Sequence, residues 1–416
     1  MLKWLLKSGF SKEEGSVRRA TRVGALGALV AALVAVAALA ATTGGHAAST
    51  GKPIVIGWAY DKSGQMAPFD DPALAAAKIR IKQVNAKGGV LGRKFVIKTC
   101  DTQNNNAARA KSCALNLLSQ GAQILFTTCD VDFATPVVQE AIKRGKLAIS
   151  TCIGTDQMGP KRFGKQGKLA FSFGNVAQDE GSAMAQYAWS RGWKTAGLGT
   201  NTLLVYFKNV VQAFEKRFKQ LGGKIVDSES YQTGQNNVNA AVAQLNTHKA
   251  AVYVTSTSFG ELPAFVSGFR SLHNNTPILN SWAGDGTYWL PKSPQVTNYY
   301  CVTYASVFGD DPSKDVRALI GQMKKAGSPP GTGGFLGGAD TIDGLAIAIK
   351  KAHGSTNGAA LAAQLVKFKD VKVLGGTIRF SSKFHTVFGR TYRVIKIQDN
   401  KAKFVGTVKA KVVPNL

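Results

Sequence analysis

From Pro53 onward, short apolar runs alternate with longer runs in which apolar residues recur at helical spacing. The first repeat shows both patterns: Ile54–Trp58 is a continuous apolar run, and Pro72–Ala86 is an Ala-rich amphipathic run. A short apolar run bounded by turn residues predicts a buried strand, whereas the 3.6-residue period predicts a helix. Pro72 fits the first position of that helix. Strands that alternate with helices predict a parallel α/β sheet.

The alternation continues in two similar series. The first series predicts further strands at Phe95–Thr99, Gln123–Thr127, Leu147–Ser150 and Ala170–Phe173, with helices at Asn106–Gln120 and Thr135–Arg144. The second predicts strands at Thr195–Gly199, Lys224–Ser228, Ala251–Thr255, Ile278–Ser281 and Tyr299–Ala305, with helices at Ser182–Arg191, Val205–Leu221, Asn237–Thr247 and Glu261–Leu272. The sequence therefore predicts two Rossmann-like halves.

The last hundred residues differ from these series. Three helices are predicted there, at Ser313–Ala326, Gly338–Ala352 and Ala359–Phe368. Gly376–Ser381 and Arg390–Gln398 are predicted to form an antiparallel hairpin, followed by a closing strand at Phe404–Val413.

The first 48 residues have the pattern of a signal peptide. Basic residues precede an Ala/Val/Leu run at Val23–Ala41, and Gly45-His46-Ala47 fits a cleavage site of small residues. A cut after Ala40 is an alternative, and so is an uncleaved anchor, because the run approaches the length of a membrane span. The expected location is therefore exported, either periplasmic or at the cell surface.

Charge narrows the class of partner. The 416 residues include 52 Lys and Arg against 24 Asp and Glu, a net charge of +28. Residues 1–48 carry six basic and two acidic residues, so the exported chain keeps +24. A basic surface suits contact with anionic cell-envelope polymers, and an anionic ligand is a second interpretation. The basic residues are scattered and no nucleic-acid module is visible, which argues against nucleic acid as a partner.

The segment from Val84 to Asp101 combines a helix end, a glycine turn and a strand. Part of its sequence resembles the N-terminal lobe of bacterial solute-binding proteins of the branched-chain amino-acid (Leu/Ile/Val) type. This part reads Asn85-Ala86-Lys87-Gly88-Gly89-Val90-Leu91-Gly92-Arg93. That resemblance implies the type I periplasmic-binding-protein fold, in which two Rossmann-like lobes enclose a central cleft and a three-crossing hinge joins them. It assigns residues 53–176 plus 309–372 to the N-terminal lobe and residues 177–308 plus 373–416 to the C-terminal lobe.

The same resemblance implies a function. The protein is expected to be the external binding protein of an ABC transporter, closing on a small polar solute such as an amino acid and delivering it to a membrane permease. A monomer suits a cleft that must close, and no cofactor is expected. A ligand sensor that signals to a membrane receptor, and an envelope-associated structural protein with a vestigial cleft, are the alternatives.

Loops at the carboxyl ends of parallel strands are where ligands bind in such sheets. The candidate ligand-binding residues in these loops are Ser63, Gly64, Gln65, Asp130, Asp132, Thr151, Thr155, Tyr206, Phe259, Trp282 and Asp285. Tyr206, Phe259 and Trp282 would supply apolar walls, unless they serve ordinary core or hinge packing.

One loop departs from the family. Where the family holds an amino-acid carboxylate with hydroxyls, this chain has Cys129-Asp130-Val131-Asp132. A carboxylate beside a ligand carboxylate would repel it. The two acids are expected either to face ligand hydroxyls or an amine, or to cap the helix that begins near Thr135.

Five cysteines are present, so at least one is unpaired within the chain. Cys129 and Cys152 follow neighbouring strands, close enough for a disulfide. Cys100 then pairs with Cys113, or alternatively with Cys129, the latter closer to a bridge of the family. Cys301 is expected to be a buried free thiol.

Enzyme motifs are missing from the sequence. No His-Glu-x-x-His, Gly-x-Ser-x-Gly or P-loop occurs, and the five histidines are scattered. Gly331, Gly333 and Gly337 follow a Pro-Pro pair and no strand, so they are interpreted as a connection. Catalysis is therefore not expected.

Overall fold

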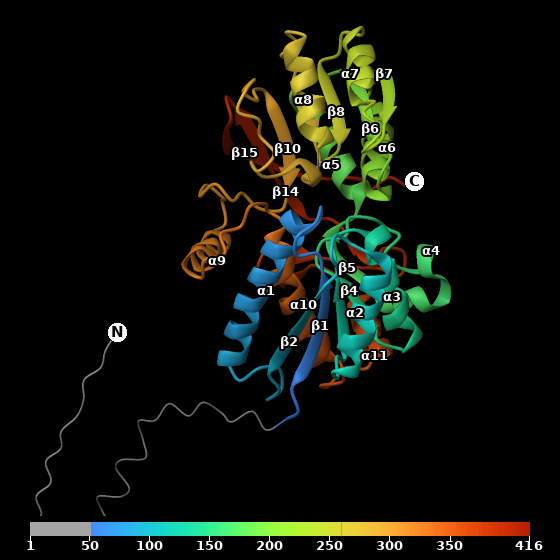
Figure 1. Cartoon of the computed structure of the whole chain (residues 1–416), viewed down its shortest axis with the longest axis vertical. Coiled ribbons are helices and arrows are strands. Elements are labelled where there is room, and N and C mark those ends of the chain that lie inside the picture. The colour runs from blue at the N-terminus through green and yellow to red at the C-terminus, as the bar shows by residue number, and fades with distance from the viewer. Residues whose placement is uncertain (1–50, 259) are drawn as a thin grey trace, which may run out of the picture. The chain divides into compact units, whose positions relative to one another are not determined.

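The computed structural model describes residues 51–258 and 260–416, so the predicted signal peptide and Phe259 lie outside the described residues. The strands form two main sheets, one of six strands in the order β13-β5-β4-β3-β1-β2 and one of seven in the order β15-β14-β10-β9-β8-β6-β7. Each sheet is the centre of one lobe (Figure 1).

All strand pairs in the sheet of the first lobe are parallel. Its strands are β1 (Ile54–Tyr60), β2 (Phe95–Asp101), β3 (Ile124–Thr127), β4 (Leu147–Ser150), β5 (Ala170–Asn175) and β13 (Thr386–Val387). Its helices are α1 (Ala67–Ala86), α2 (Ala107–Ser119), α3 (Val131–Lys143), α4 (Pro160–Phe163), a 3-10 helix (Gly164–Leu169), α10 (Phe335–Lys351) and α11 (Gly358–Leu365). Helix α1 packs on α10, and α2 packs on α3. Figure 1 shows α1 to the left of β1 and α3 to the right of β4.

The second lobe combines a parallel sheet with an antiparallel edge. The parallel strands are β6 (Thr195–Asn201), β7 (Lys224–Tyr231), β8 (Val252–Ser256), β9 (Ile278–Asn280) and β10 (Tyr299–Thr303). Strands β14 (Thr391–Gln398) and β15 (Lys401–Lys409) add to β10 in antiparallel pairs. The helices are α5 (Ala177–Ser190), α6 (Val205–Gln220), α7 (Val238–Asn246), α8 (Glu261–Ser271) and a 3-10 turn at Trp282–Gly284; α9 (Lys314–Lys325) lies in the connection back to the first lobe.

The chain passes between the two sheets three times, after β5, after β10 and after β13. The predicted fold class, two lobes joined by three crossings, is confirmed. Thr386–Val387 still belongs to the first sheet, so the third passage follows residue 387, later than the expected boundary at residue 373.

The predicted hairpin of Gly376–Ser381 with Arg390–Gln398 is wrong. Strand β12 (Gly376–Ile378) pairs instead with β11 (Val371–Val373), and β14 pairs with β15. Asp399 and Asn400 make the second turn with φ of 52° and 58°, the left-handed values that a tight two-residue hairpin needs.

Three helices begin four or five residues earlier than their sequence pattern predicts. Helix α1 begins at Ala67, so Pro72 lies inside it rather than at its first position. Pro72 has no N–H to donate to the carbonyl of Pro68, and the hydroxyl of Thr332 donates to that carbonyl instead, at 3.4 Å. Helix α3 begins at Val131 and α5 at Ala177.

Two disulfides cross-link the first lobe, as expected. Cys100 pairs with Cys113, with their Cα atoms 5.5 Å apart, and Cys129 pairs with Cys152 at 4.9 Å. Cys301 is a buried free thiol. No helix within residues 51–258 or 260–416 has both the length and the apolar character to cross a bilayer.

Candidate ligand-binding cleft

A small cavity of about 20 Å³ lies where the strand-end loops of the two lobes meet. The first lobe contributes Met66, Phe69, Cys129 and Asp130, and the second contributes Leu204, Tyr206, Phe207, Ser258, Trp282 and Ala283. A space of this size holds at most about one water molecule. The cleft is therefore closed in this structure.

Aromatic rings fill the cleft across the lobe boundary. The indole of Trp282 stacks on Tyr304 at 5.1 Å and meets the edge of Phe69, from the first lobe, at 5.0 Å. Tyr206 meets Trp282 at 6.4 Å with their planes 70° apart. Such edge and stacked contacts stabilise the closed arrangement beyond simple apolar burial.

Glu180 lies behind this aromatic cluster, fully buried in the first turn of α5. The Tyr206 hydroxyl donates to its Oε2 at 2.8 Å, and the backbone N–H of Trp282 donates to its Oε1 at 2.6 Å. Burial raises the pKa of the Glu180 carboxyl to about 8, against the lowering effect of both hydrogen bonds. The carboxyl therefore positions two cleft aromatics and holds a proton near neutral pH.

Asp130 both lines the cavity and caps α3. Its Oδ1 accepts from the N–H groups of Asp132 at 2.8 Å and Phe133 at 3.4 Å, so the capping expectation holds for this residue. Burial raises its pKa to about 7. No Lys or Arg belongs to the described residues that line the cavity, and Asp130 is the single carboxyl among them.

Two contacts outside the cavity join the lobes. The ring of Tyr206 lies against Gly154, where an added Cβ would stand 2.6 Å from the ring. The Thr155 hydroxyl donates to Asn209 Oδ1 at 3.1 Å. Because both contacts require the lobes to be together, they mark the closed form.

The other expected residues lie outside the cavity. The backbone of Ser63–Gln65 forms a loop that Asp61 and Asn104 hold, with the Gly64 N–H bonded to Asp61 and the Gln65 N–H to Asn104. The Thr151 hydroxyl contacts Cys152 Sγ at 3.1 Å.

Two acids expected in the site also have other contacts. Asp132 forms an ion pair with Arg162 at 2.7 Å, where both side chains are partly exposed. Asp285 is buried and accepts from the Thr303 hydroxyl at 2.6 Å and from the Gly333 N–H. Burial raises its pKa to about 6, and its bonds tie the loop after β9 to the connection that leads into α10.

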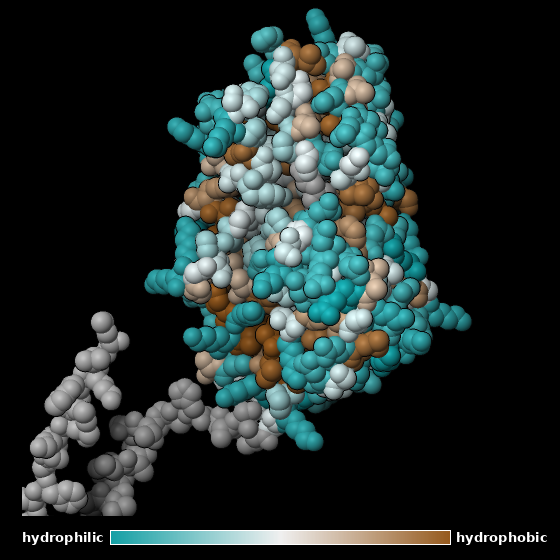
Figure 2. Space-filling view, viewed as in Figure 1, coloured by the Kyte–Doolittle hydropathy of each residue, from teal (hydrophilic) through white to brown (hydrophobic). Residues whose placement is uncertain are grey.

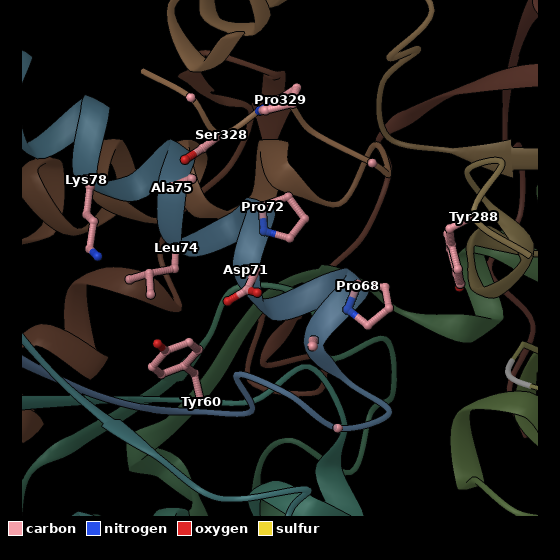
Figure 3. Close-up of a pocket in the computed structure, with 14 residues that line it drawn as sticks. Tyr60, Pro68, Asp71, Pro72, Leu74, Ala75, Lys78, Tyr288, Ser328 and Pro329 are labelled. Atoms are coloured by element: carbon pink, nitrogen blue, oxygen red, sulfur yellow. The ribbon is translucent and has the colours of Figure 1, made fainter. Parts of the chain in front are cut away.

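A larger open groove of about 750 Å³ lies beside α1 (Figure 3). Figure 3 shows Tyr60, Asp71 and Lys78 on one side of Pro68 and Pro72, with Tyr288 of the second lobe across from them. Of the expected site residues, Gly64 lines this groove, whereas Asp130, Tyr206 and Trp282 line the small cavity. We therefore place the candidate ligand site at the small cavity, between the strand ends of both lobes.

Asp70 and the Cys129–Cys152 disulfide lie next to the cavity, which Cys129 lines. The carboxyl of Asp70 accepts from the N–H groups of Asp61 at 2.8 Å and Cys129 at 2.9 Å, and burial raises its pKa to about 8. The ligand atoms of Asp70, Cys129 and Cys152 lie within 4.8 Å of one another. Both sulfurs are bonded to each other, so neither is a thiolate that could hold a metal ion.

The family model of periplasmic binding proteins matches residues 53–402, and the chain belongs to this family. Among curated proteins it is similar to "Leu/Ile/Val-binding protein homolog 3" of Brucella melitensis, with 22% identity over 346 residues that cover 82% of this chain and 90% of that protein. The expected resemblance to Leu/Ile/Val-binding proteins is confirmed.

Solved structures agree on the fold. The branched-chain amino-acid binding protein LivJ of Streptococcus pneumoniae, in complex with isoleucine, superposes with a TM-score of 0.71 at 21% identity and covers 85% of this chain and 99% of that chain. A solute-binding protein of an ABC transporter from R. palustris, in complex with 4-hydroxybenzoate, has a TM-score of 0.73 at 15% identity. The match covers 87% of this chain and 98% of that chain.

Sequence reasoning missed several residues that line the cavity. Leu204 and Phe207 flank the expected Tyr206, while Ser258 and Ala283 lie in loops that were expected to face the cleft. Met66 and Phe69 were missed because α1 was expected to begin only at Pro72. Glu180 was missed for the same kind of reason, since α5 was expected to begin at Ser182.

Proposed function

We propose that this protein is the extracytoplasmic substrate-binding protein of an ABC transporter. It captures a small polar solute, an amino acid or related compound, between its lobes, and hinge closure presents the loaded form to a membrane permease. The observation that carries the proposal is a cavity lined from both lobes at the strand carboxyl ends, in a chain of this family. A monomer without a cofactor and without catalysis suffices for this role.

The lining favours a particular kind of solute. Rings of Phe69, Tyr206 and Trp282 suit an apolar part, and the carboxyl of Asp130 suits an amine or hydroxyl donor. With no lining cation among the described residues, a ligand carboxylate would depend on backbone N–H groups and on hydroxyls such as that of Ser258. Thr151, Thr155 and Ser63–Gln65 are proposed to reach the solute only when the lobes open to admit it.

A ligand screen tests the proposal. Residues 49–416 would be heated with amino acids, small amides, polyamines, sugars and aromatic acids, each far above its expected dissociation constant. Binding at 100 times the dissociation constant stabilises by about 2.7 kcal/mol, which gives a clear rise in melting temperature. The rise should disappear in Trp282→Ala and persist in Trp193→Phe, a change of an aromatic that lies outside the cavity.

The narrow cavity favours one alternative, an envelope-associated structural protein whose cleft is vestigial. Phe69, Tyr206 and Trp282 occupy the space that a solute would need. The same screen separates the two functions, since a vestigial cleft gives no shift with any solute. A ligand-dependent rise in melting temperature, together with capture of the permease, supports the transport function.

A further inference from the structure

The first lobe has one strongly basic end, opposite the cleft. This basic end consists of the segments that lead into its strands and the turn between α10 and α11, namely residues 51–53, 87–94, 119–123, 143–146, 164–169 and 351–358. Together they contain ten Lys and Arg residues and no Asp or Glu. The loops at the other ends of the strands, residues 61–66, 102–106, 128–130 and 151–159, contain three Asp and one Lys. Charge is thus separated along the strand direction.

Direct contacts join five of these six segments into one surface. The guanidinium of Arg93 donates to the carbonyls of Lys52 at 2.8 Å and Gly354 at 2.7 Å. Gly358 packs so closely on the 143–146 turn that an added Cβ would stand 2.4 Å from the Gly145 carbonyl. Helix α11 also packs on the 3-10 helix at 164–169. Figure 1 shows the start of β1 and helix α11 at the same lower end of the lobe.

Helix dipoles explain only part of this charge. Helix C-termini meet at this end, and cations there are stabilising. Lys87, Lys143, Arg144 and Lys351 are placed at such termini.

Five other lysines lie outside the ends of the α-helices: Lys52, Lys94, Lys146, Lys165 and Lys168. Their ammonium groups have no ion pair or hydrogen bond within the described residues, and all except the half-buried Lys146 are exposed. Unpaired like charges repel one another, so these lysines lower the stability of the free lobe.

We propose that the basic end of the first lobe is a docking surface for a linear polyanion of the cell envelope, a chain with repeated phosphate or carboxylate groups. Repeated anions satisfy several ammonium groups at once, and release of their counterions favours binding. The six segments contain no Phe, Trp or Tyr to enter a bilayer, which favours a polymer over a membrane surface.

This orientation is compatible with the proposed function, on whose exported location the inference rests. A membrane partner that recognises closure must contact both lobes around the cleft. The basic end points the opposite way, so polymer and permease can be engaged together. The bound polymer would keep the protein concentrated near its transporter.

Two matched variants test the inference, each with five lysines changed to glutamine in residues 49–416. The docking variant changes Lys52, Lys94, Lys146, Lys165 and Lys168. The control changes Lys249, Lys292, Lys314, Lys324 and Lys325, which are exposed and lie on the second lobe or on α9. Both lose the same net charge. The probe is long-chain inorganic polyphosphate, with binding measured as a function of salt.

We expect the docking variant to bind polyphosphate at least about tenfold more weakly, with a shallower dependence of log Kd on log salt, because fewer counterions are released. The control should stay within about threefold, since distant surface charges are screened. Equal weakening in both variants, or no binding of the unchanged protein at about 0.15 M salt, would overturn the inference. Binding to phosphatidylglycerol vesicles but not to polyphosphate would overturn it in favour of a membrane surface. The solute-induced thermal shift, measured on the same variants, reports separately on the cleft.

Discussion

At the scale of single residues, the buried carboxyl of Glu180 links the hinge to the cleft. It accepts hydrogen bonds from the hydroxyl of Tyr206, at the start of α6, and from the backbone N–H of Trp282, in the turn after β9. Its pKa of about 8 lies above the usual value for a glutamate, because burial disfavours the charged form. Between the usual glutamate pKa of about 4.3 and the folded value of about 8, the Glu180 carboxyl of the folded protein holds a proton that the unfolded chain does not.

Stability should therefore fall as pH rises. A raised carboxyl pKa stabilises the fold fully only below the unfolded pKa of about 4.3, and this contribution is lost as pH rises through the folded value. We expect the urea midpoint of the native chain to drop between pH 5 and pH 9, and the drop to be smaller in Glu180→Gln. The glutamine is less stable at low pH, because its single oxygen cannot replace both acceptors.

A control variant and one contradicting outcome test this pH dependence of stability. Asp70, whose pKa is also about 8, retains part of the slope in the Glu180 variant. Ala318→Ser, at an exposed position, changes no titratable group and should leave the slope unchanged. An identical slope in Glu180→Gln and the native chain would show that Glu180 is already ionised at neutral pH.

Residue chemistry allowed only part of the site to be predicted. Tyr206, Trp282 and Asp130 were expected from strand-end position, and the structure brings all three to one cavity. Glu180 and Phe69 could not be found in this way, because each lies in the first turn of a helix whose sequence pattern becomes amphipathic only later. Their placement depends on how helix starts are packed between the lobes, which no local pattern specifies.

At the scale of elements, buried strands were the easiest to predict from sequence. Runs such as Leu147–Ser150 are covered on both faces and therefore read as continuous apolar segments. The C-terminal strands were harder, since Gly376–Ile378 and Thr391–Gln398 both look like edge strands. Their partners are fixed by the two-residue turns at 374–375 and 399–400, and by docking on β10, rather than by apolar pattern.

The Cys129–Cys152 bridge connects the loop after β3 to the loop after β4, directly beside the cavity. Replacing both cysteines by alanine should lower the free energy of unfolding by about 3 kcal/mol, as expected for a closed loop of this length. It should also weaken the solute-induced thermal shift, because Cys129 lines the cavity. Chemical unfolding and the ligand screen measure the two effects.

The second disulfide serves as the control for that experiment. Cys100 and Cys113 join β2 to α2 outside the cavity. Their double alanine variant should lose stability but keep the response to solute. Equal loss of response in both variants would argue that the bridges act only through overall stability.

At the scale of the whole molecule, buried charges gather where the chain passes between lobes. Arg390, between β13 and β14, forms an ion pair with Asp340 of α10 and donates from Nε to Asn175 Oδ1 at 3.0 Å. The hydroxyl oxygen of Tyr304, which follows β10, accepts a hydrogen bond from the backbone N–H of Asn175 at 3.1 Å. All three passages are therefore held in one buried polar network.

Breaking this network should be costly. Arg390→Met leaves the Asp340 carboxylate buried without its cation, and a loss of about 3–5 kcal/mol is expected from such a change. Adding Asp340→Asn removes the stranded charge while keeping an acceptor for the Gly375 N–H, so part of the stability should return. A double-mutant cycle in urea measures the coupling, and strictly additive losses would contradict it.

The late position of β13 has a consequence for how the protein is made. Strand β5 pairs with β13 on its outer edge, and α1 packs on α10, yet β13 and α10 come from the last quarter of the chain. While the ribosome is still adding those residues, the first lobe has an open sheet edge and an uncovered apolar helix face. The first lobe therefore stays incompletely folded until α10 and β13 have been made, and an incompletely folded chain is the state in which a polypeptide can be threaded through a translocation pore.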